Sequence, residues 1–133
     1  MTEIRRGLLD TSVLIDHDLI DADRLPDESA IAAVTLAELA AGPHATEDDS
    51  ERARRQDRLQ WASATWDPLP FDADAARAYG RVYAAVKASG RRHRSRLADL
   101  LIASTAAANE LAIYTRNASD LKALEDIIDI IAI

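Results

Sequence analysis

Short apolar runs that alternate with helix-like segments are the strongest constraint on how this chain can fold. Each run is continuous rather than alternating, as expected for strands that are buried on both faces by crossover helices. The sequence therefore predicts an α/β domain whose sheet is mainly parallel and covered by helices. The runs are Gly7-Leu8-Leu9, Ile31 to Val34, Ala112 to Thr115 and Ile127 to Ile133, the last broken only by Asp129 and Ala132.

The segments between these runs carry helix signals. Thr35 and Glu38 have the spacing of a capping box, and Gly42-Pro43 is a stop signal, so a helix is expected to begin at Thr35 and end near Gly42. Asp72 is positioned to cap a helix in which apolar side chains recur at helical spacing. Further helices are expected to begin at Thr11, to cover much of 47–66 and to run over 97–108.

Length and composition limit the class of protein. A chain of 133 residues without a linker-like tract predicts a single domain over 1–133. Cysteine is absent, which excludes disulfides and cysteine-bound zinc and is compatible with the cytoplasm. No apolar run reaches the roughly 18 residues that a membrane span requires, so we expect no membrane association.

A net charge of −7 excludes a protein that coats nucleic acid over its whole surface, because phosphate binding depends on lysine and arginine. One local basic cluster departs from this balance, in the segment 90–96. Its arginines Arg92, Arg94 and Arg96 are candidates for RNA contacts. A solvated charged loop is the alternative interpretation.

Four acidic residues, Asp10, Glu38, Asp99 and Asp120, lie near places where a strand or loop gives way to a helix. Each one can be explained singly as a helix-capping residue. Right-handed crossovers, however, bring all strand-to-helix turns to one edge of a parallel sheet. Carboxylates gathered there would repel one another unless a cation were present, and hard oxygen ligands without cysteine or clustered histidine suit Mg²⁺ or Mn²⁺.

Each of the four acids stands within a short motif. The segments are LLDTSVLI at 8–15, TLAEL at 35–39, DLLIA at 99–103 and TRNASD at 115–120. Together they resemble the motifs of the PIN-domain ribonucleases, in particular the VapC toxins of toxin–antitoxin pairs. The resemblance extends over nearly the whole chain, with four motifs in the expected order. One departure is Leu121, where family members commonly have phenylalanine.

The resemblance implies a three-layer α/β/α PIN-like domain with Mg²⁺- or Mn²⁺-dependent endoribonuclease activity. It also implies an RNA substrate, a VapB-like antitoxin as partner, and a homodimer that assembles further with the antitoxin. The expected metal ligands are Asp10 and Asp99, with Glu38 bound directly or through water, and Asp120 as a fourth ligand or an outer group. Side chains expected to orient these acids or the phosphate are Thr11, Ser12, Thr115 and Asn117.

Other classes fit less well. A phosphatase of the Asp-x-Asp type would have an acid where Ser12 stands, and a phosphoacceptor domain would have paired acids after its first strand and a lysine after a later one. A P-loop or Rossmann enzyme is excluded because the four glycines form no suitable run. The alternative that stays open is a catalytically silent PIN-like domain that only binds a partner.

Overall fold

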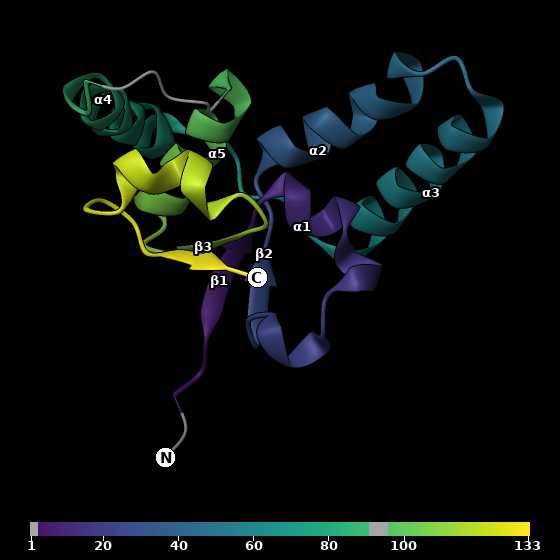
Figure 1. Cartoon of the computed structure of the whole chain (residues 1–133), viewed down its shortest axis with the longest axis horizontal. Coiled ribbons are helices and arrows are strands. Elements are labelled where there is room, and N and C mark those ends of the chain that lie inside the picture. The colour runs from purple at the N-terminus through teal and green to yellow at the C-terminus, as the bar shows by residue number, and fades with distance from the viewer. Residues whose placement is uncertain (1–2, 91–95) are drawn as a thin grey trace.

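Four short strands form one parallel sheet in the computed structural model, which describes residues 3–90 and 96–133. The strand order is β2-β1-β3-β4, and every neighbouring pair is parallel (Figure 1). The parallel sheet expected from the apolar runs is therefore confirmed. The strands are β1 (Arg6–Leu9), β2 (Glu28–Ala30), β3 (Ala112–Thr115) and β4 (Ile130–Ala132).

Helices connect and cover the strands. The Asp72 side chain accepts a hydrogen bond from the Ala75 N–H at 3.0 Å, which confirms the expected cap of α4. The α-helices are α1 (Thr11–Ile15), α2 (Ala33–Ala41), α3 (Asp49–Thr65), α4 (Ala73–Ala88) and α5 (Leu97–Ala108). The 3-10 segments are η1 (His17–Leu19), η2 (Ala22–Arg24), η3 (Gly42–Ala45) and η4 (Ala118–Leu124). None of the helices in the described part of the chain is both long and apolar enough to cross a membrane.

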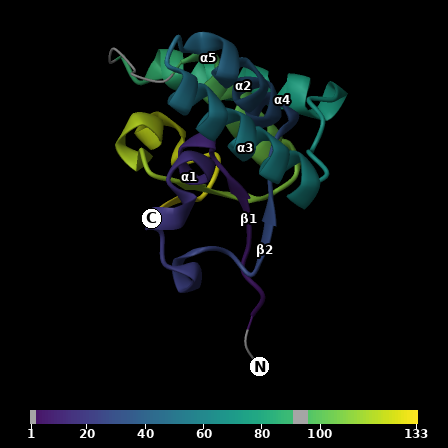
Figure 2. The ribbon, with the colours of Figure 1, turned by 90° about the vertical axis from the view of Figure 1, so that its right-hand side faces the viewer.

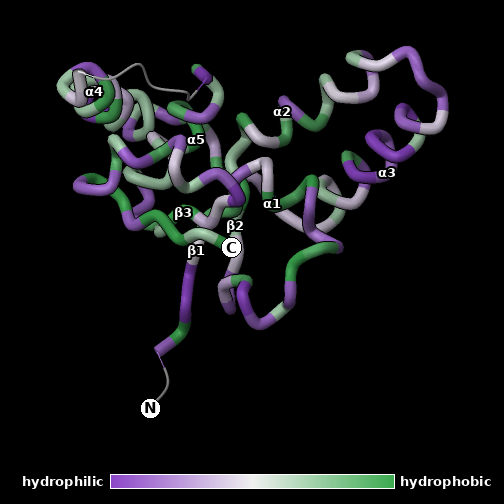
Figure 3. Tube along the Cα trace, in the orientation of Figure 1, coloured by the Kyte–Doolittle hydropathy of each residue, from purple (hydrophilic) through white to green (hydrophobic). Residues whose placement is uncertain are grey.

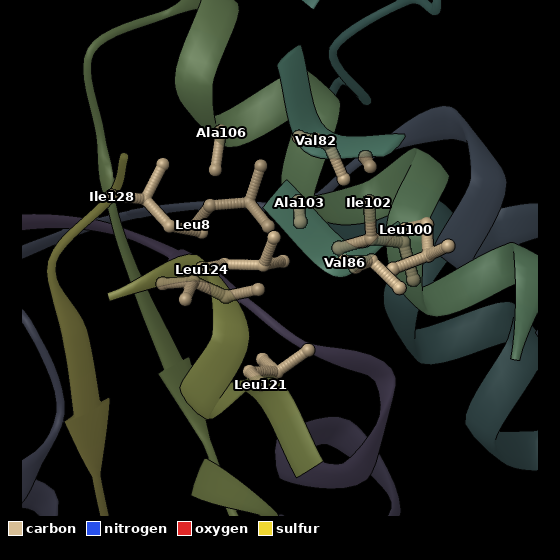
Figure 4. Packing of buried hydrophobic residues seen from close by; sticks show 12 residues of the cluster. Leu8, Val82, Val86, Leu100, Ile102, Ala103, Ala106, Leu121, Leu124 and Ile128 are labelled. Carbon is tan, nitrogen blue, oxygen red and sulfur yellow. The ribbon is translucent and has the colours of Figure 1, made fainter. Parts of the chain in front are cut away.

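Two apolar clusters lie on the two faces of the sheet, because successive side chains of a strand point to opposite sides. Leu8 and Ile113 belong to the cluster under α4, α5 and η4, which Figure 4 shows converging around Leu8 and Leu124. Leu9 and Tyr114 belong to the cluster under α1, α2 and α3. The fold is thus the expected three-layer α/β/α arrangement.

Gly7 in β1 permits a close approach between the strands and an aromatic ring. A Cβ atom at this position would overlap the ring of Tyr114. Tyr114 is almost fully buried, so its ring cannot move to solvent. The absence of a side chain at Gly7 therefore fixes how Tyr114 packs beside the end of β1.

Helices α2 and α3 run side by side as a hairpin that projects from the sheet (Figure 1, Figure 2). Most of α3 is hydrophilic (Figure 3), and Ala62 is its fully buried residue. Two arginines of α3 bind carbonyl groups of η3: Arg52 Nε donates to Pro43 O at 3.2 Å, and Arg55 Nη1 to Gly42 O at 2.9 Å. Polar contacts therefore fix the far end of this hairpin.

The capping box expected at Thr35 and Glu38 is wrong. Helix α2 begins at Ala33, so Thr35 lies inside the first turn and its side chain is fully buried. The expected strand at 31–34 is also misplaced, because β2 ends at Ala30. Ile31 and Ala32 continue the extended chain and pack on opposite faces, with Ala32 forming an isolated bridge to Leu69.

The apolar pattern also overestimated the last strand and part of the core. Only Ile130–Ala132 of the run 127–133 forms β4, while Ile128 is buried in the core without being in the strand. Two large apolar side chains of the helices, Tyr83 of α4 and Leu97 of α5, are 54% and 62% exposed. The interior positions of these helices are filled instead by Val82 and Leu100.

Candidate active site

Asp10 lies directly after β1, at the carboxyl edge of the sheet. Its N–H donates to the Tyr114 carbonyl at 2.9 Å, so the parallel pairing of β1 and β3 continues to this residue. Its side chain accepts the Thr11 N–H at 2.9 Å and thereby caps α1. Asp10 is only 7% exposed, and it is the one acidic side chain that is buried in the described residues.

Two hydroxyl groups donate to the same oxygen of this carboxylate. Ser12 Oγ lies 2.9 Å and Thr115 Oγ1 2.8 Å from Asp10 Oδ2. The Ser12 oxygen accepts the Arg116 N–H at 3.1 Å, and the Thr115 oxygen accepts the Asn117 N–H at 3.0 Å. Because each hydroxyl has a single proton, a backbone donor on its oxygen directs that proton to Asp10.

The pKa of Asp10 is raised above the ordinary value of 3.8, chiefly because burial disfavours the charged form. Hydrogen bonds from Thr115 and Ser12 oppose this shift, and the negative charge of Asp99 adds to it. The repulsion expected between acids at this edge is therefore present, but burial has the larger effect. A nearby positive charge would therefore stabilise the ionised form of Asp10.

Glu38 reaches the same region from α2. Thr11 Oγ1 donates to Glu38 Oε1 at 2.7 Å and also lies 3.0 Å from Thr35 Oγ1. The other Glu38 oxygen, Oε2, accepts a hydrogen bond from Arg96 Nη2 at 3.2 Å. Adjacent residues Asp10 and Thr11 thus connect the end of β1 with the Glu38 carboxylate.

Arg96 connects Glu38 with Asp99. The Arg96 guanidinium lies 3.2 Å from Glu38 Oε2 and 3.9 Å from Asp99 Oδ2. Asp99 Oδ2 also accepts the Arg96 N–H at 2.9 Å, so Asp99 caps α5 as its capping interpretation predicts. The Arg96 side chain is 72% exposed, which leaves its guanidinium free to turn toward solvent.

A pocket of about 280 Å³ opens beside this group, and Thr11, Glu38 and Arg96 line it together with Arg55 and Arg58 of α3. The pocket is therefore lined by two acids, Glu38 and Glu51, and by three arginines. This charge pattern suits a phosphate chain that approaches a carboxylate site.

Asp120 lies in η4, the segment that follows β3 at this edge of the sheet. Its N–H donates to the Asn117 carbonyl at 3.0 Å, and the Asn117 side chain makes no capping hydrogen bond to η4. Asn117 contributes to the site through its backbone N–H instead. Two of the candidate RNA-binding residues, Arg92 and Arg94, lie outside the described residues.

The chemistry of the donor set fits a hard divalent cation, since the side chains that meet at the sheet edge offer carboxylate and hydroxyl oxygens. The acidic side chains lie farther apart than the ligands of a preformed metal site. Over 3–90 and 96–133, no three acidic or histidine side chains converge closely enough to hold an ion together. In this structure Arg96 provides the positive charge between Glu38 and Asp99.

Sequence analysis missed two parts of the site. The buried Thr35 hydroxyl was assigned to a helix cap, although its position three residues before Glu38 places both on one helical face. The backbone N–H of Arg116 orients Ser12, a contact with no side-chain signal in the sequence. Arg96 was expected to bind RNA, and here it contacts two of the acids.

Comparisons with known proteins agree with this architecture. The PIN domain family model matches residues 7–126. Ribonuclease VapC5 of Mycobacterium tuberculosis is 39% identical over 122 residues, which cover 90% of this chain and 87% of that protein. Ribonuclease VapC8 of the same species is 37% identical over 105 residues, covering 78% of this chain and 93% of that protein.

A solved structure gives the same result in three dimensions. The crystal structure of VapBC-5, a toxin–antitoxin system member from Mycobacterium tuberculosis, superposes with a TM-score of 0.84 at 38% identity. The match covers 96% of this chain and 98% of that chain. With the family model, the sequence relatives and the parallel sheet in agreement, this chain belongs to the PIN-domain family, in its VapC group.

Proposed function

We propose that this protein is a metal-dependent endoribonuclease and the toxin of a VapBC-type toxin–antitoxin pair. The observation that carries the proposal is the buried Asp10 carboxylate, which two oriented hydroxyls hold beside the charge of Asp99 at the carboxyl edge of the sheet. The names of the relatives, both ribonucleases, support the same reaction. RNA is the proposed substrate and the cytoplasm the proposed compartment.

The proposed ligands of a Mg²⁺ or Mn²⁺ ion are Asp10 and Asp99, with Glu38 binding directly or through water and Asp120 as a fourth or outer group. When bound, such an ion activates water and offsets charge on the phosphoryl oxygens. Ser12 and Thr115 orient Asp10, and Thr11 orients Glu38, so that the carboxylates are held before any ligand arrives.

Arg96 has two roles in this proposal. In the free protein its guanidinium neutralises part of the charge of Glu38 and Asp99. Its exposure allows it to leave the acids and contact an RNA phosphate, as proposed also for Arg92 and Arg94. We expect products with a 5′-phosphate and a 3′-hydroxyl, because attack by water does not require the ribose 2′-hydroxyl.

The decisive experiment compares two acids that cap helices. Purified protein is incubated with a structured RNA in Mg²⁺ or Mn²⁺, with and without EDTA, alongside the variants Asp99→Asn and Asp72→Asn. Both substitutions keep a side-chain oxygen for the helix cap. We expect EDTA and Asp99→Asn to abolish cleavage and Asp72→Asn to leave it intact. Cleavage that persists in EDTA would rule out the metal mechanism.

The alternative, a PIN-like domain that only binds a partner, makes a different prediction in the same assay. It would bind its partner tightly and show no turnover with either metal. Asp10→Asn would then leave partner binding unchanged. The hydrogen bonds that orient Asp10 favour the enzyme, because a binding module has no need of a buried carboxylate with a raised pKa.

A second pocket, of about 470 Å³, lies between α1, η1 and α3, and it is the proposed antitoxin site. Leu14, Ile15, His17 and Trp61 supply apolar and aromatic walls, and Arg54 and Arg58 are among the charged lining residues. Ile15 is 50% exposed and also lines the pocket beside Glu38. A VapB-like antitoxin segment with an apolar face could therefore extend from this groove to the acids.

Antitoxin binding can be tested with Trp61, which lines this groove. Trp61 contacts both His17 and Trp66 edge to face, so a segment entering the groove should change tryptophan fluorescence. We expect Ile15→Asp to weaken association with the proposed VapB-like antitoxin. Sedimentation of the two proteins separately and mixed would test the proposed homodimer and its further assembly with antitoxin.

A further inference from the structure

Side-chain oxygens of Thr11, Thr35 and Glu38 lie within hydrogen-bond distance of one another in sequence, with the Thr11 oxygen in the middle. Thr11 Oγ1, at the start of α1, lies 2.7 Å from Glu38 Oε1 and 3.0 Å from Thr35 Oγ1. Thr35 and Glu38 are one turn apart on α2, so α2 binds the Thr11 hydroxyl at two points. Thr35 is fully buried, and Glu38 reaches the pocket.

We propose that Thr35 is a positioning residue for Glu38 that acts through Thr11. The Thr35 oxygen holds the Thr11 side chain in the rotamer that presents its hydroxyl to Glu38. Thr11 is the neighbour of Asp10, so this contact sets where the Glu38 carboxylate stands relative to Asp10. The inference deepens the proposed nuclease function and rests on it where metal binding is concerned.

The location of the Thr35 hydroxyl argues for this role. Valine has nearly the same shape as threonine and would fill the same buried space. It would do so without a hydroxyl group, whose burial costs free energy unless the hydroxyl is hydrogen-bonded. The two buried hydroxyls of α5 donate within their own helix: Ser104 to the Leu100 carbonyl at 2.7 Å and Thr105 to the Leu101 carbonyl at 3.0 Å. Thr35 instead contacts a side chain of another helix that touches an acid of the site.

The first experiment needs no metal. Three-bond NMR couplings to the Thr11 methyl carbon report its side-chain rotamer in the wild-type protein and in Thr35→Val, Thr35→Ser and Thr105→Val. We expect one rotamer in the wild type, in Thr35→Ser and in the control Thr105→Val, which alters a buried threonine of α5. Rotamer averaging is expected in Thr35→Val. A single unchanged rotamer in Thr35→Val would overturn the proposal.

The second experiment measures Mn²⁺ affinity by water-proton relaxation, with RNA cleavage recorded beside it. Thr35→Val should weaken Mn²⁺ binding roughly three- to tenfold, somewhat less than the 10- to 100-fold typical of groups that contact a metal ligand directly. Thr35→Ser should restore the affinity, and Thr105→Val should not change it. Thermal unfolding in EDTA checks that each variant is folded.

A double-mutant cycle separates positioning from a general packing effect. If Thr35 acts through Thr11, then Thr35→Val should have no further effect on Mn²⁺ affinity in a Thr11→Val background. Additive losses would overturn the proposal and indicate a packing role. A wild-type protein that neither binds Mn²⁺ nor cleaves RNA would refute the proposed function, and the Thr11 couplings would still decide whether Thr35 holds Thr11.

Discussion

The Thr115 hydroxyl donates to Oδ2 of Asp10 across 2.8 Å, at the ends of two neighbouring strands. Strand β1 pairs with β3 in a register that sets Leu9 opposite Tyr114, and the next residue on each strand contributes to this bond. A shift of one strand by one residue would turn its side chains to the opposite face of the sheet and separate the pair. The site therefore depends on strand register as much as on the acidic residues themselves.

Replacing Thr115 by valine should impair the site without emptying space in the core. Asp10 would lose a hydroxyl that stabilises its charged form, so its pKa would rise further. We expect metal affinity to fall about 10- to 100-fold and the acid limb of the pH–rate profile to move to higher pH. Thr115→Ser should retain most of the affinity. An unchanged acid limb in Thr115→Val would contradict this reading.

The raised pKa of Asp10 predicts how stability of the metal-free protein changes with pH. From the ordinary value of 3.8 upward to the raised folded value, the folded protein binds a proton that the unfolded chain has lost. The contribution of Asp10 to stability therefore falls as pH rises through this window. Chemical unfolding at several pH values should therefore give a slope of stability against pH that is more negative in the wild type than in Asp10→Asn. Equal slopes would contradict the prediction.

Arg96→Met tests whether Arg96 competes with a metal ion for Glu38 and Asp99. Removal of this positive charge leaves Glu38 and Asp99 without their counter-ion, so affinity for Mn²⁺ should rise by roughly two- to fivefold, through the lost repulsion. The exposed ion pairs contribute below about 1 kcal/mol to stability. The control is Arg77→Met, which removes a similarly exposed ion pair with Asp74 on α4. Calorimetric titration with Mn²⁺ measures both, and weaker binding in Arg96→Met would refute this role.

Two glycines should respond in opposite directions to alanine. Gly7→Ala should destabilise the fold by about 1–3 kcal/mol, because the added methyl group overlaps the Tyr114 ring in a packed interior. Gly80→Ala should stabilise it by about 0.5–1 kcal/mol, because Gly80 lies inside α4 with open space around it. Urea unfolding of both variants gives the comparison, and a neutral Gly7→Ala would contradict the close approach.

The sequence predicts the layers of this fold well, because strands buried on both faces leave continuous apolar runs. It predicts the boundaries of strands less well, because some buried apolar residues are not paired in the sheet. Ile31 and Ala32 are as apolar as a strand, yet the pairing with β1 lies upstream at Glu28–Ala30. Ile128 is likewise buried without being in β4. Hydrophobicity records burial, and the hydrogen-bond partner of a strand is decided by tertiary structure.

The acids at the sheet edge follow from topology, whereas their orienting contacts depend on geometry that spacing alone does not encode. Asp10, Glu38 and Asp99 are linked through Thr11 and Arg96, contacts that join three separate helices. The capping signal at Thr35 was misleading, since the chain turns helical two residues earlier and buries that hydroxyl. A local motif cannot distinguish a cap from a contact with another helix.

Glu38 precedes Leu39, which packs in the apolar cluster on one face of the sheet, and Asp99 precedes Leu100, which packs in the cluster on the other. The two acids are therefore anchored in different halves of the interior. A copy of the protein that has lost either half, through local opening or a proteolytic cut, would retain only part of the acidic group. Damaged or incompletely folded chains should consequently lack the proposed metal site, because the complete acidic group requires both halves of the interior to be folded.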